Sequence, residues 1–474
     1  MLGRIARHLK ISVSAIMDGI TQEQADQITE LTIQECDVEL LKHFKNLKKL
    51  KIKPNLRDMG ITLDLDISNM EKLESLDIIA TDGITNINID NAPNLNAINI
   101  SGNKGLEKTT GLEDLKELKT LLMVDNNVLK EIPDIQSIAH GQNIETLQVD
   151  FDWLHLFEEK YGNLDKIQDD DVMKNKVTLI EKMGRFIYPL ELDKGIEVEK
   201  KSKEILDQII DDSMSETEKI CAINTWLVDN VEYDFNVIDE RDDASAGKIE
   251  LEGQRAIDNI RANSAYNSLV LQSAVCEGYT NGMKYLLNKA GIEAEKVDCR
   301  YWDEEDEEIT DYIHPKNSNH SIIRFKTKDG WFYSDPTFDS MNPCKRKFFF
   351  KTKSEMANVH GLSISEMNVE SPDVRSEEYS NEALSKILTE QLRRNRKKEK
   401  QSSKDDKKEY KEQPETKNRP DESPEGWRKS FRFNIPPEQY QEVLEIHQQM
   451  EEKFEKGEIE NAEDKVEPTE HGVK

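Results

Sequence analysis

The first third of the chain repeats one short arrangement of apolar positions. Each copy reads apolar-x-x-apolar-x-apolar, and the middle residues of successive copies are 19, 26, 11, 11, 23 and 26 residues apart. The copies are Ile28/Leu31/Ile33, Leu47/Leu50/Ile52, Leu73/Leu76/Ile78, Ile84/Ile87/Ile89, Leu95/Ile98/Ile100, Leu118/Leu121/Met123 and Ile144/Leu147/Val149. A short strand with one apolar face buries that face by stacking on its neighbours, which gives a continuous ladder of side chains. Residues 28–149 are therefore predicted to form a curved stack of short strands.

The stretch "NLNAINISGNKGLEKTTGLEDLKELKTLLMVDNN" shows the arrangement best, because asparagines and glycines follow its short strands. The pattern resembles leucine-rich repeats, whose period is roughly 20 to 29 residues. This resemblance implies a leucine-rich-repeat solenoid over residues 28–150, with residues 1–27 as an N-terminal cap. Solenoids present broad concave surfaces, so this region is expected to bind a protein substrate or partner. A generic mixture of short strands and helices is the alternative.

Further along the chain the apolar spacing becomes that of helices and then of strands. Residues 151–199 are predicted to be a helical connector. Ser215 and Glu218 form a capping box before the helical stretch "ICAINTWLVDNV". From Glu293 to Phe350 the chain reads as short strands, and "HSIIRFKTKDGWFYSD" predicts a hairpin that turns at Asp329-Gly330. Residues 200–375 are therefore predicted to be one α+β domain.

The composition changes at about residue 376. The stretch "QLRRNRKKEKQSSKDDKKEYKEQPETKNRPDESPEG" is charged and almost free of large apolar side chains. Such a segment buries too little surface to offset its chain entropy, so residues 376–474 are predicted to be a mostly disordered tail. One amphipathic helix, "IPPEQYQEVLEIHQQMEEKFEKGE", is expected within it and would dock on the body or on a partner.

Charge and cysteine content narrow the function classes. The formal net charge of the 474 residues is −30, which argues against generic nucleic-acid binding because phosphate repels an acidic chain. The five cysteines are widely spaced and include no CxxC pair, which disfavours a disulfide framework and a structural zinc site. No signal peptide or membrane-spanning stretch is evident. We expect a cytoplasmic protein without membrane contact; export without a recognisable signal peptide is the alternative.

Cys276 is the first candidate for chemistry. It begins a predicted helix in "VCEGYTNGMKYLLNKAG", where Tyr279, Met283 and Leu286 follow at helical spacing and Gly291 marks the end. The N-terminus of a helix favours the thiolate, which is the reactive form of cysteine. A lone cysteine is, however, more often a small buried apolar residue.

Two later residues supply a possible base and its orienting group. His320 opens the first strand of the predicted hairpin, and Asp335 ends the second. A cysteine, a histidine and a carboxylate are the nucleophile, base and orienting group of a triad. A turn centred on Asp329-Gly330 would place His320 opposite Asp339, so Asp339 stays open as the carboxylate. His314 lies in a polar loop and His360 in a helical-looking stretch, and both are expected to be structural or solvated. The acidic run at 303–308 is expected to be an ordinary exposed loop, with a cation site as the alternative.

Three motifs together resemble the transglutaminase-like superfamily. They are "VCEGY" around Cys276, the strand opening "HSIIRF" at His320, and "WFYSDPTFD" around Asp335. The resemblance covers roughly residues 200–370 and implies a papain-like fold with a catalytic triad of these residues. It also implies a weak oxyanion role for Tyr266, for which a packed aromatic residue is the alternative. Many members carry a tryptophan two residues after the histidine, where this chain has Ile322.

The resemblance implies cysteine-dependent acyl transfer or hydrolysis on protein or peptide amides through a thioester, with no cofactor and no metal. The residues do not separate a protease from a deamidase or a cross-linking transferase. The alternative is a non-enzymatic interaction protein, in which the repeats bind the partner and the transglutaminase-like part is an inactive scaffold.

Overall fold

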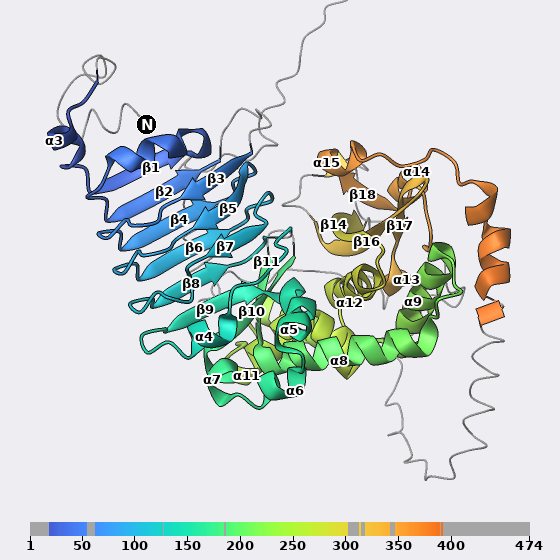
Figure 1. Ribbon diagram of the computed structural model, residues 1–474. Helices are drawn as coiled ribbons and strands as arrows, with labels where there is room; N and C mark the ends of the chain where they lie inside the picture. The colour runs from blue at the N-terminus through green and yellow to red at the C-terminus, as the bar shows by residue number, and fades with distance from the viewer. Residues whose placement is uncertain are drawn as a thin grey trace, which may run out of the picture. The chain divides into compact units, whose positions relative to one another are not determined.

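The computed structural model describes residues 19–54, 62–126, 128–183, 186–301, 312–313, 318–341, 347–388 and 390–391. The chain divides into two compact units, Met1–Glu199 and Lys200–Lys474 (Figure 1). Several predicted features lie outside the described residues: most of the N-terminal cap, the acidic run at 303–308, His314, and the tail beyond residue 391 with its amphipathic helix. Within the part of the chain that is described, every helix is too short or too polar to cross a lipid bilayer.

The first unit is a β-solenoid-like stack with a long sheet and a short one (Figure 1). The long sheet runs in the order β1-β2-β4-β6-β8-β9-β10-β11, and its neighbours are parallel except for the antiparallel pair β10 and β11. The short sheet is the parallel set β3-β5-β7. The strands are β1 (Glu30–Gln34), β2 (Lys49–Lys53), β3 (Leu63–Asp66), β4 (Ser75–Ile79), β5 (Ile84–Asn88), β6 (Ala97–Ser101), β7 (Lys108–Thr110), β8 (Thr120–Met123), β9 (Thr146–Asp150), β10 (Val177–Met183) and β11 (Phe186–Glu191).

The repeated apolar positions form the core of this unit. Every side chain of the seven copies is at most 5% exposed, which confirms the predicted inward positions. Six middle residues pair in register across the long sheet: Leu31, Leu50, Leu76, Ile98, Leu121 and Leu147. The seventh, Ile87, lies on β5 of the short sheet, where it pairs with Leu65. The two steps of 11 residues therefore arise because the chain passes from one sheet to the other and back.

Buried asparagines connect consecutive turns of the stack. The side-chain amide of Asn103 donates to the carbonyl of Ile78 at 3.0 Å, and that of Asn126 donates to the carbonyl of Ile100 at 2.7 Å. The Asn126 side-chain oxygen accepts from the backbone N–H of Asn103 at 3.1 Å. These bonds satisfy backbone groups inside the stack, where an unpaired group would be costly.

The predicted helical connector at 151–199 is only partly helical. Helices α5 (Leu154–Tyr161), α6 (Leu164–Gln168) and α7 (Asp171–Lys176) are followed by the strands β10 and β11. Val177 pairs with Leu147, and Val177 and Leu179 are at most 2% exposed, so this segment continues the apolar ladder. The segment at 177–183 is a strand because it pairs with β9, which lies nearly 30 residues earlier in the sequence. The remaining elements of this unit are α3 (Gln22–Ala25), η1 (Glu35–His43), α4 (Ile135–Ala139), η2 (Phe151–Trp153) and the start of α8 (Leu192–Ile209).

The second unit combines helices with a five-stranded sheet in the order β15-β18-β14-β16-β17. All neighbours are antiparallel except β15 and β18. The predicted capping box is present, because Ser215 and Glu218 exchange side-chain-to-backbone bonds of 2.9 and 3.2 Å. The elements of this unit are α9 (Glu216–Asn230), β12 (Glu232–Tyr233), α10 (Phe235–Ser245), α11 (Gly253–Arg261), η3 (Asn267–Leu271), β13 (Ser273–Ala274), α12 (Cys276–Lys289), β14 (Ala294–Tyr301), β15 (Tyr312–Ile313), β16 (His320–Thr327), β17 (Gly330–Ser334), α13 (Pro336–Met341), α14 (Lys353–Ala357), β18 (His360–Ser363), α15 (Ile364–Met367) and η5 (Glu377–Tyr379).

The described part of the predicted tail belongs to this unit. Tyr379 is 2% exposed, and its ring centroid lies 4.9 Å from that of Phe350 and 5.0 Å from that of Phe332. The Gln391 side chain donates to the carbonyl of Glu218 at 2.6 Å. One aromatic anchor and one buried amide therefore hold the start of the predicted tail, residues 376–388 and 390–391, against the second unit.

Candidate active site

Cys276 is the first residue of α12, as its position in the sequence predicts. Val275 is the extended residue before the helix, and Tyr279, Met283 and Leu286 on the inner face are fully buried. Gly291 follows the helix with a φ of +82°, which suits the left-handed stop that glycine provides. The Cys276 side chain is therefore held at the positive end of a 14-residue helix, although the residue itself is only 3% exposed.

Gly278 allows this first helical turn to lie against the preceding chain. A Cβ at this position would lie 2.5 Å from the carbonyl oxygen of Ala262 and 2.8 Å from the Cβ of Ala274. The backbone N–H of Val275 donates to the same Ala262 carbonyl at 3.2 Å. Packing thus explains the glycine of the "VCEGY" motif, because any side chain at this position would push the start of α12 away from residues 262–264.

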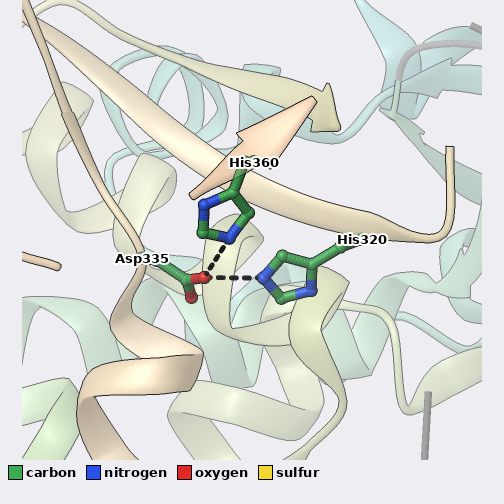
Figure 2. A group of neighbouring side chains, drawn as sticks. All are labelled: His320, Asp335 and His360. Atoms are coloured by element: carbon green, nitrogen blue, oxygen red, sulfur yellow. Dashed lines mark hydrogen bonds and ion pairs between the residues drawn. The ribbon is translucent and has the colours of Figure 1, made fainter. Parts of the chain in front are cut away.

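His320 and Asp335 meet although the predicted register did not bring them together. Thr327 pairs with Gly330, so the turn is centred on Lys328-Asp329, one residue earlier than predicted. The chain leaves β17 after Ser334, and Asp335 then precedes α13. His320 Nε2 lies 2.7 Å from Asp335 Oδ2, as Figure 2 shows.

The other carboxyl oxygen of Asp335 caps α13. Its Oδ1 accepts from the backbone N–H of Phe338 at 3.0 Å, which fixes the carboxylate plane relative to the helix. Asp339, the other candidate, accepts instead from the backbone N–H of Phe348 at 2.8 Å. The geometry therefore assigns the carboxylate beside His320 to Asp335.

Thr280 joins the helix of Cys276 to the strand of His320. Its hydroxyl oxygen lies 3.0 Å from the Cys276 carbonyl and 3.1 Å from the Ser321 carbonyl. The side chain of Cys276 interacts with the His320 ring and raises the pKa of that ring. The nucleophile candidate and the base candidate are therefore neighbours.

A second histidine contacts the same carboxylate. His360 opens β18, is 0% exposed, and places its Nε2 3.0 Å from Asp335 Oδ2. Its ring is stacked on that of His320, with centroids 5.4 Å apart and an interplanar angle of 19°. The prediction that His360 lies in a helical stretch with a structural or solvated side chain missed this contact. The sequence gives little local signal for this strand, because "HGLS" contains a single large apolar residue, Leu362.

The charges of the three residues follow from burial and from Asp335. Burial opposes a charge on His320, but the Asp335 carboxylate outweighs it and raises the pKa of His320 to about 10. Burial would raise the pKa of Asp335, but the two histidines hold that pKa well below its usual range. For His360 burial prevails and lowers the pKa, although Asp335 acts in the opposite direction. At neutral pH the group is thus an imidazolium at His320, a carboxylate at Asp335 and a neutral ring at His360.

Comparison with known proteins identifies one family model within the second unit. Residues 203–336 match the family model of the transglutaminase-like superfamily. The second unit contains a transglutaminase-like domain. A solved structure titled "Crystal structure of a TGase" is similar at 14% sequence identity with a TM-score of 0.22, and the match covers 38% of this chain and 38% of that chain. No curated protein matches the chain.

The transglutaminase-like domain also groups three metal-donor atoms, those of His320, Asp335 and His360, within 4.8 Å of one another. A histidine that binds a metal through one nitrogen usually donates its other N–H to an acceptor. The Nδ1 of His360 is buried and has no hydrogen-bond partner among the described residues. A neutral ring with its proton on Nε2 and a bare lone pair on Nδ1 fits this environment better than a metal ligand does.

Two tyrosines of the transglutaminase-like domain are candidates for the oxyanion role. Tyr266 is 5% exposed, and the guanidinium of Arg261 lies over its ring at 5.9 Å from the centroid, which agrees with a packed aromatic residue. Tyr233 was not singled out from the sequence. It pairs with Ala274 just before Cys276, and burial followed by the charge of Cys276 raises the pKa of Tyr233. Tyr233 is therefore the tyrosine that the structure associates with Cys276.

A second cysteine and a buried ion pair lie close to Cys276 and His320. Cys299 pairs with His320 in the sheet, and burial, followed by Asp335, raises the pKa of the Cys299 thiol far above its ordinary value. The Lys296 ammonium lies 2.5 Å from the Glu277 carboxylate and 2.6 Å from that of Asp298. Cys299 therefore stays a protonated thiol, and the charge of Glu277, next to Cys276, is neutralised.

Proposed function

We propose that the transglutaminase-like domain is a cysteine-dependent enzyme that transfers or hydrolyses acyl groups of protein or peptide amides. One observation supports this most: the Cys276 thiol, at the N-terminus of α12, interacts with His320, whose Nε2 is bonded to Asp335 at 2.7 Å. This is the order of nucleophile, base and orienting carboxylate that acyl transfer through cysteine requires.

The proposed reaction proceeds in two steps. The Cys276 thiolate attacks the amide carbonyl, the C–N bond breaks, and the imidazolium of His320 gives its proton to the departing amine, which leaves a thioester. An amine or a water molecule then attacks the thioester; His320 takes the proton of this nucleophile, and the Cys276 thiolate leaves. Asp335 holds Nε2 of His320 and so directs Nδ1 toward the sulfur. No cofactor enters either step.

The competing proposal is an inactive scaffold, and burial favours it. Cys276 and His320 are each only 3% exposed and Asp335 is fully buried, so a substrate reaches the thiol only after neighbouring segments move. Ile322 stands where many members have tryptophan, which removes an aromatic contact for substrate. In this proposal the first unit carries the function and binds a protein partner.

The first unit supports a binding role in either case. We infer that the stack is a leucine-rich-repeat solenoid, because its repeated strands, inward aliphatic residues and buried asparagines are those of such repeats. Its sheet presents a broad surface for a protein substrate or partner. A cytoplasmic location is proposed with it, since Cys221, Cys276 and Cys299 form no disulfide.

The test is the alkylation rate of each cysteine against pH with a small reagent such as iodoacetamide, assigned by mass spectrometry. Cys276 should react fastest of the five cysteines at neutral pH, because a helix N-terminus and a neighbouring imidazolium favour the thiolate. Cys221 and Cys299 are matched controls, because both lack a disulfide and are 0% exposed, so burial alone would slow all three cysteines.

Two variants connect the reactivity to the proposed base. His320→Ala should slow alkylation of Cys276 sharply near neutral pH, and Asp335→Asn should slow it less, because Asp335 only orients the ring. If Cys276 reacts no faster than Cys221 and Cys299, or ignores His320→Ala, the scaffold proposal takes its place.

A further inference from the structure

Two histidines share one oxygen of one buried carboxylate. His320 Nε2 lies 2.7 Å and His360 Nε2 lies 3.0 Å from Asp335 Oδ2, and all three residues are at most 3% exposed (Figure 2). The reaction proposed above uses His320 and Asp335. His360 has no role in that reaction, so a physical reason is needed for a second histidine beside Asp335.

Filling of the core does not supply that reason. The site of His360 is lined by aromatic rings: Tyr301, Phe338 and Phe348 lie 6.5, 5.4 and 6.2 Å from it, centroid to centroid. A phenylalanine or leucine would satisfy such surroundings without burying an imidazole nitrogen that has no partner among the described residues. What the histidine adds over an apolar residue is one N–H donor directed at Asp335.

We propose that His360 is a positioning residue, whose N–H fixes Asp335 Oδ2 and takes up part of its negative charge, so that His320 holds its proton less tightly. The proposal rests on the function proposed for Cys276 and His320. With Oδ1 held by the backbone N–H of Phe338 and Oδ2 by His360, the carboxylate cannot rotate away from His320. Both of its oxygens are fixed independently of the base.

The charge sharing matters because His320 must both take and give a proton. A buried carboxylate with a single donor would concentrate its charge on the His320 ring and make the imidazolium a poor acid toward the departing amine. A second donor on the same oxygen weakens that attraction. The neutral state of His360 is essential here, because a second positive charge would repel the imidazolium; burial, which lowers the pKa of His360, keeps the ring neutral.

Other ionisable groups face the pair and must be considered in any pH measurement. They are Cys276 on α12, Cys299 and Tyr301 on β14, Tyr233 on β12 and Asp339 on α13. Burial raises the pKa of Cys299 and of Tyr233, so neither changes charge at neutral pH. His360 is thus the neighbour whose removal changes the hydrogen bonding of Asp335 without changing a charge.

The experiment measures the protonation of His320 in the full chain. NMR of protein labelled at the histidine Cε1 carbons, with His320→Ala for assignment, gives the titration midpoint of His320. His360→Phe keeps a ring against His320 and removes the donor. We expect its His320 midpoint to rise by about 0.5 to 1 pH unit, the equivalent of one net hydrogen bond. His360→Gln keeps an N–H donor and should restore a midpoint near that of the wild type.

The matched control is His140→Phe in the first unit. His140 also bonds to a carboxylate, Asp170, at 2.8 Å, but far from the site in sequence and in the other unit, so His320 should titrate as in the wild type. An unchanged His320 midpoint in a folded His360→Phe protein would refute the positioning role.

A second measurement needs no variant. The ¹⁵N shifts of His360 in the wild type should show a neutral ring with its proton on Nε2 at pH 7, and a proton on Nδ1 instead would also refute the proposal. The alkylation of wild-type Cys276 separately tests the proposed function, so slow alkylation together with a shifted His320 midpoint would reject the enzyme and keep the positioning role.

Discussion

Replacing Gly278 with alanine tests how closely the first turn of α12 must approach the chain before it. The added Cβ would lie 2.5 Å from the backbone oxygen of Ala262, so an ordinary contact of 3.4 Å requires a separation of 3.4 − 2.5 = 0.9 Å. Overpacking of this kind costs about 1 to 3 kcal/mol, whereas alanine in place of glycine gains about 0.5 to 1 kcal/mol in a helix. We expect Gly278→Ala to lose about 1 to 2 kcal/mol of unfolding free energy.

The same shift should move Cys276, two residues away, relative to His320. A displacement of about 1 Å costs up to a hundredfold in reactions that depend on alignment, so alkylation of Cys276 should fall by roughly ten- to a hundredfold. Urea unfolding followed by tryptophan fluorescence, together with the alkylation rate, measures both effects. A Gly278→Ala protein as stable and as reactive as the wild type would show that the approach of α12 to Ala262 is unimportant.

Gly282, one turn further along α12, provides the control. Its added Cβ would lie 2.2 Å from the side-chain oxygen of Ser268, which is not backbone and can be removed. Ser268→Ala should therefore recover much of the stability lost by Gly282→Ala. No comparable second substitution exists for Gly278, because the atom in the way is a backbone carbonyl oxygen.

Two further predictions concern the core of the first unit and the pair formed by His320 and Asp335. Ile98→Ala should lower the unfolding free energy measured in urea by about 2 to 5 kcal/mol, because Ile98 is 1% exposed in the middle of the ladder. Val128→Ala should change the unfolding free energy little, because Val128 is 45% exposed. Equal effects of the two substitutions would contradict the assignment of the ladder. His320, whose pKa rises from 6.5 to about 10 on folding, should stabilise the fold fully below pH 6.5 and lose this contribution as the pH rises through 10. Thermal denaturation across this range should show a steeper fall in stability for the wild type than for His320→Gln, and parallel curves would contradict the pairing with Asp335.

The features that the sequence predicted well are those set by neighbours along the chain. Leu76, Ile98 and Leu121 could be placed because a period in the sequence reflects a period in the stack. Cys276 could be placed at a helix start because Tyr279, Met283 and the stop at Gly291 define the helix around it. In both cases the signal lies within a few turns of the residue concerned.

The features that the sequence did not predict depend on contacts between distant segments. The predicted turn placed His320 opposite Asp339, and the observed turn, one residue earlier, moves that position to Thr337. Asp335 reaches His320 because the chain leaves β17 after Ser334, and a sequence does not fix a turn or the end of a strand to that accuracy. His360 lies 25 residues after Asp335 and meets it only because β18 pairs with β14. The segment that begins at Val177 likewise forms a strand because it pairs with the backbone of β9.

The packing of Tyr379 has a practical consequence for expressing the transglutaminase-like domain by itself. A fragment cut to the family match, residues 203–336, would end one residue after Asp335 and lack both His360 and Tyr379. Phe332, now fully buried against Tyr379, would become accessible to water, which favours aggregation. Asp335 would also lose the N–H donors of Phe338 and His360, so a pKa measured for His320 in the fragment would differ from that in the intact chain. Fragments intended for enzymology should therefore extend to at least residue 391, where Gln391 is bonded to α9.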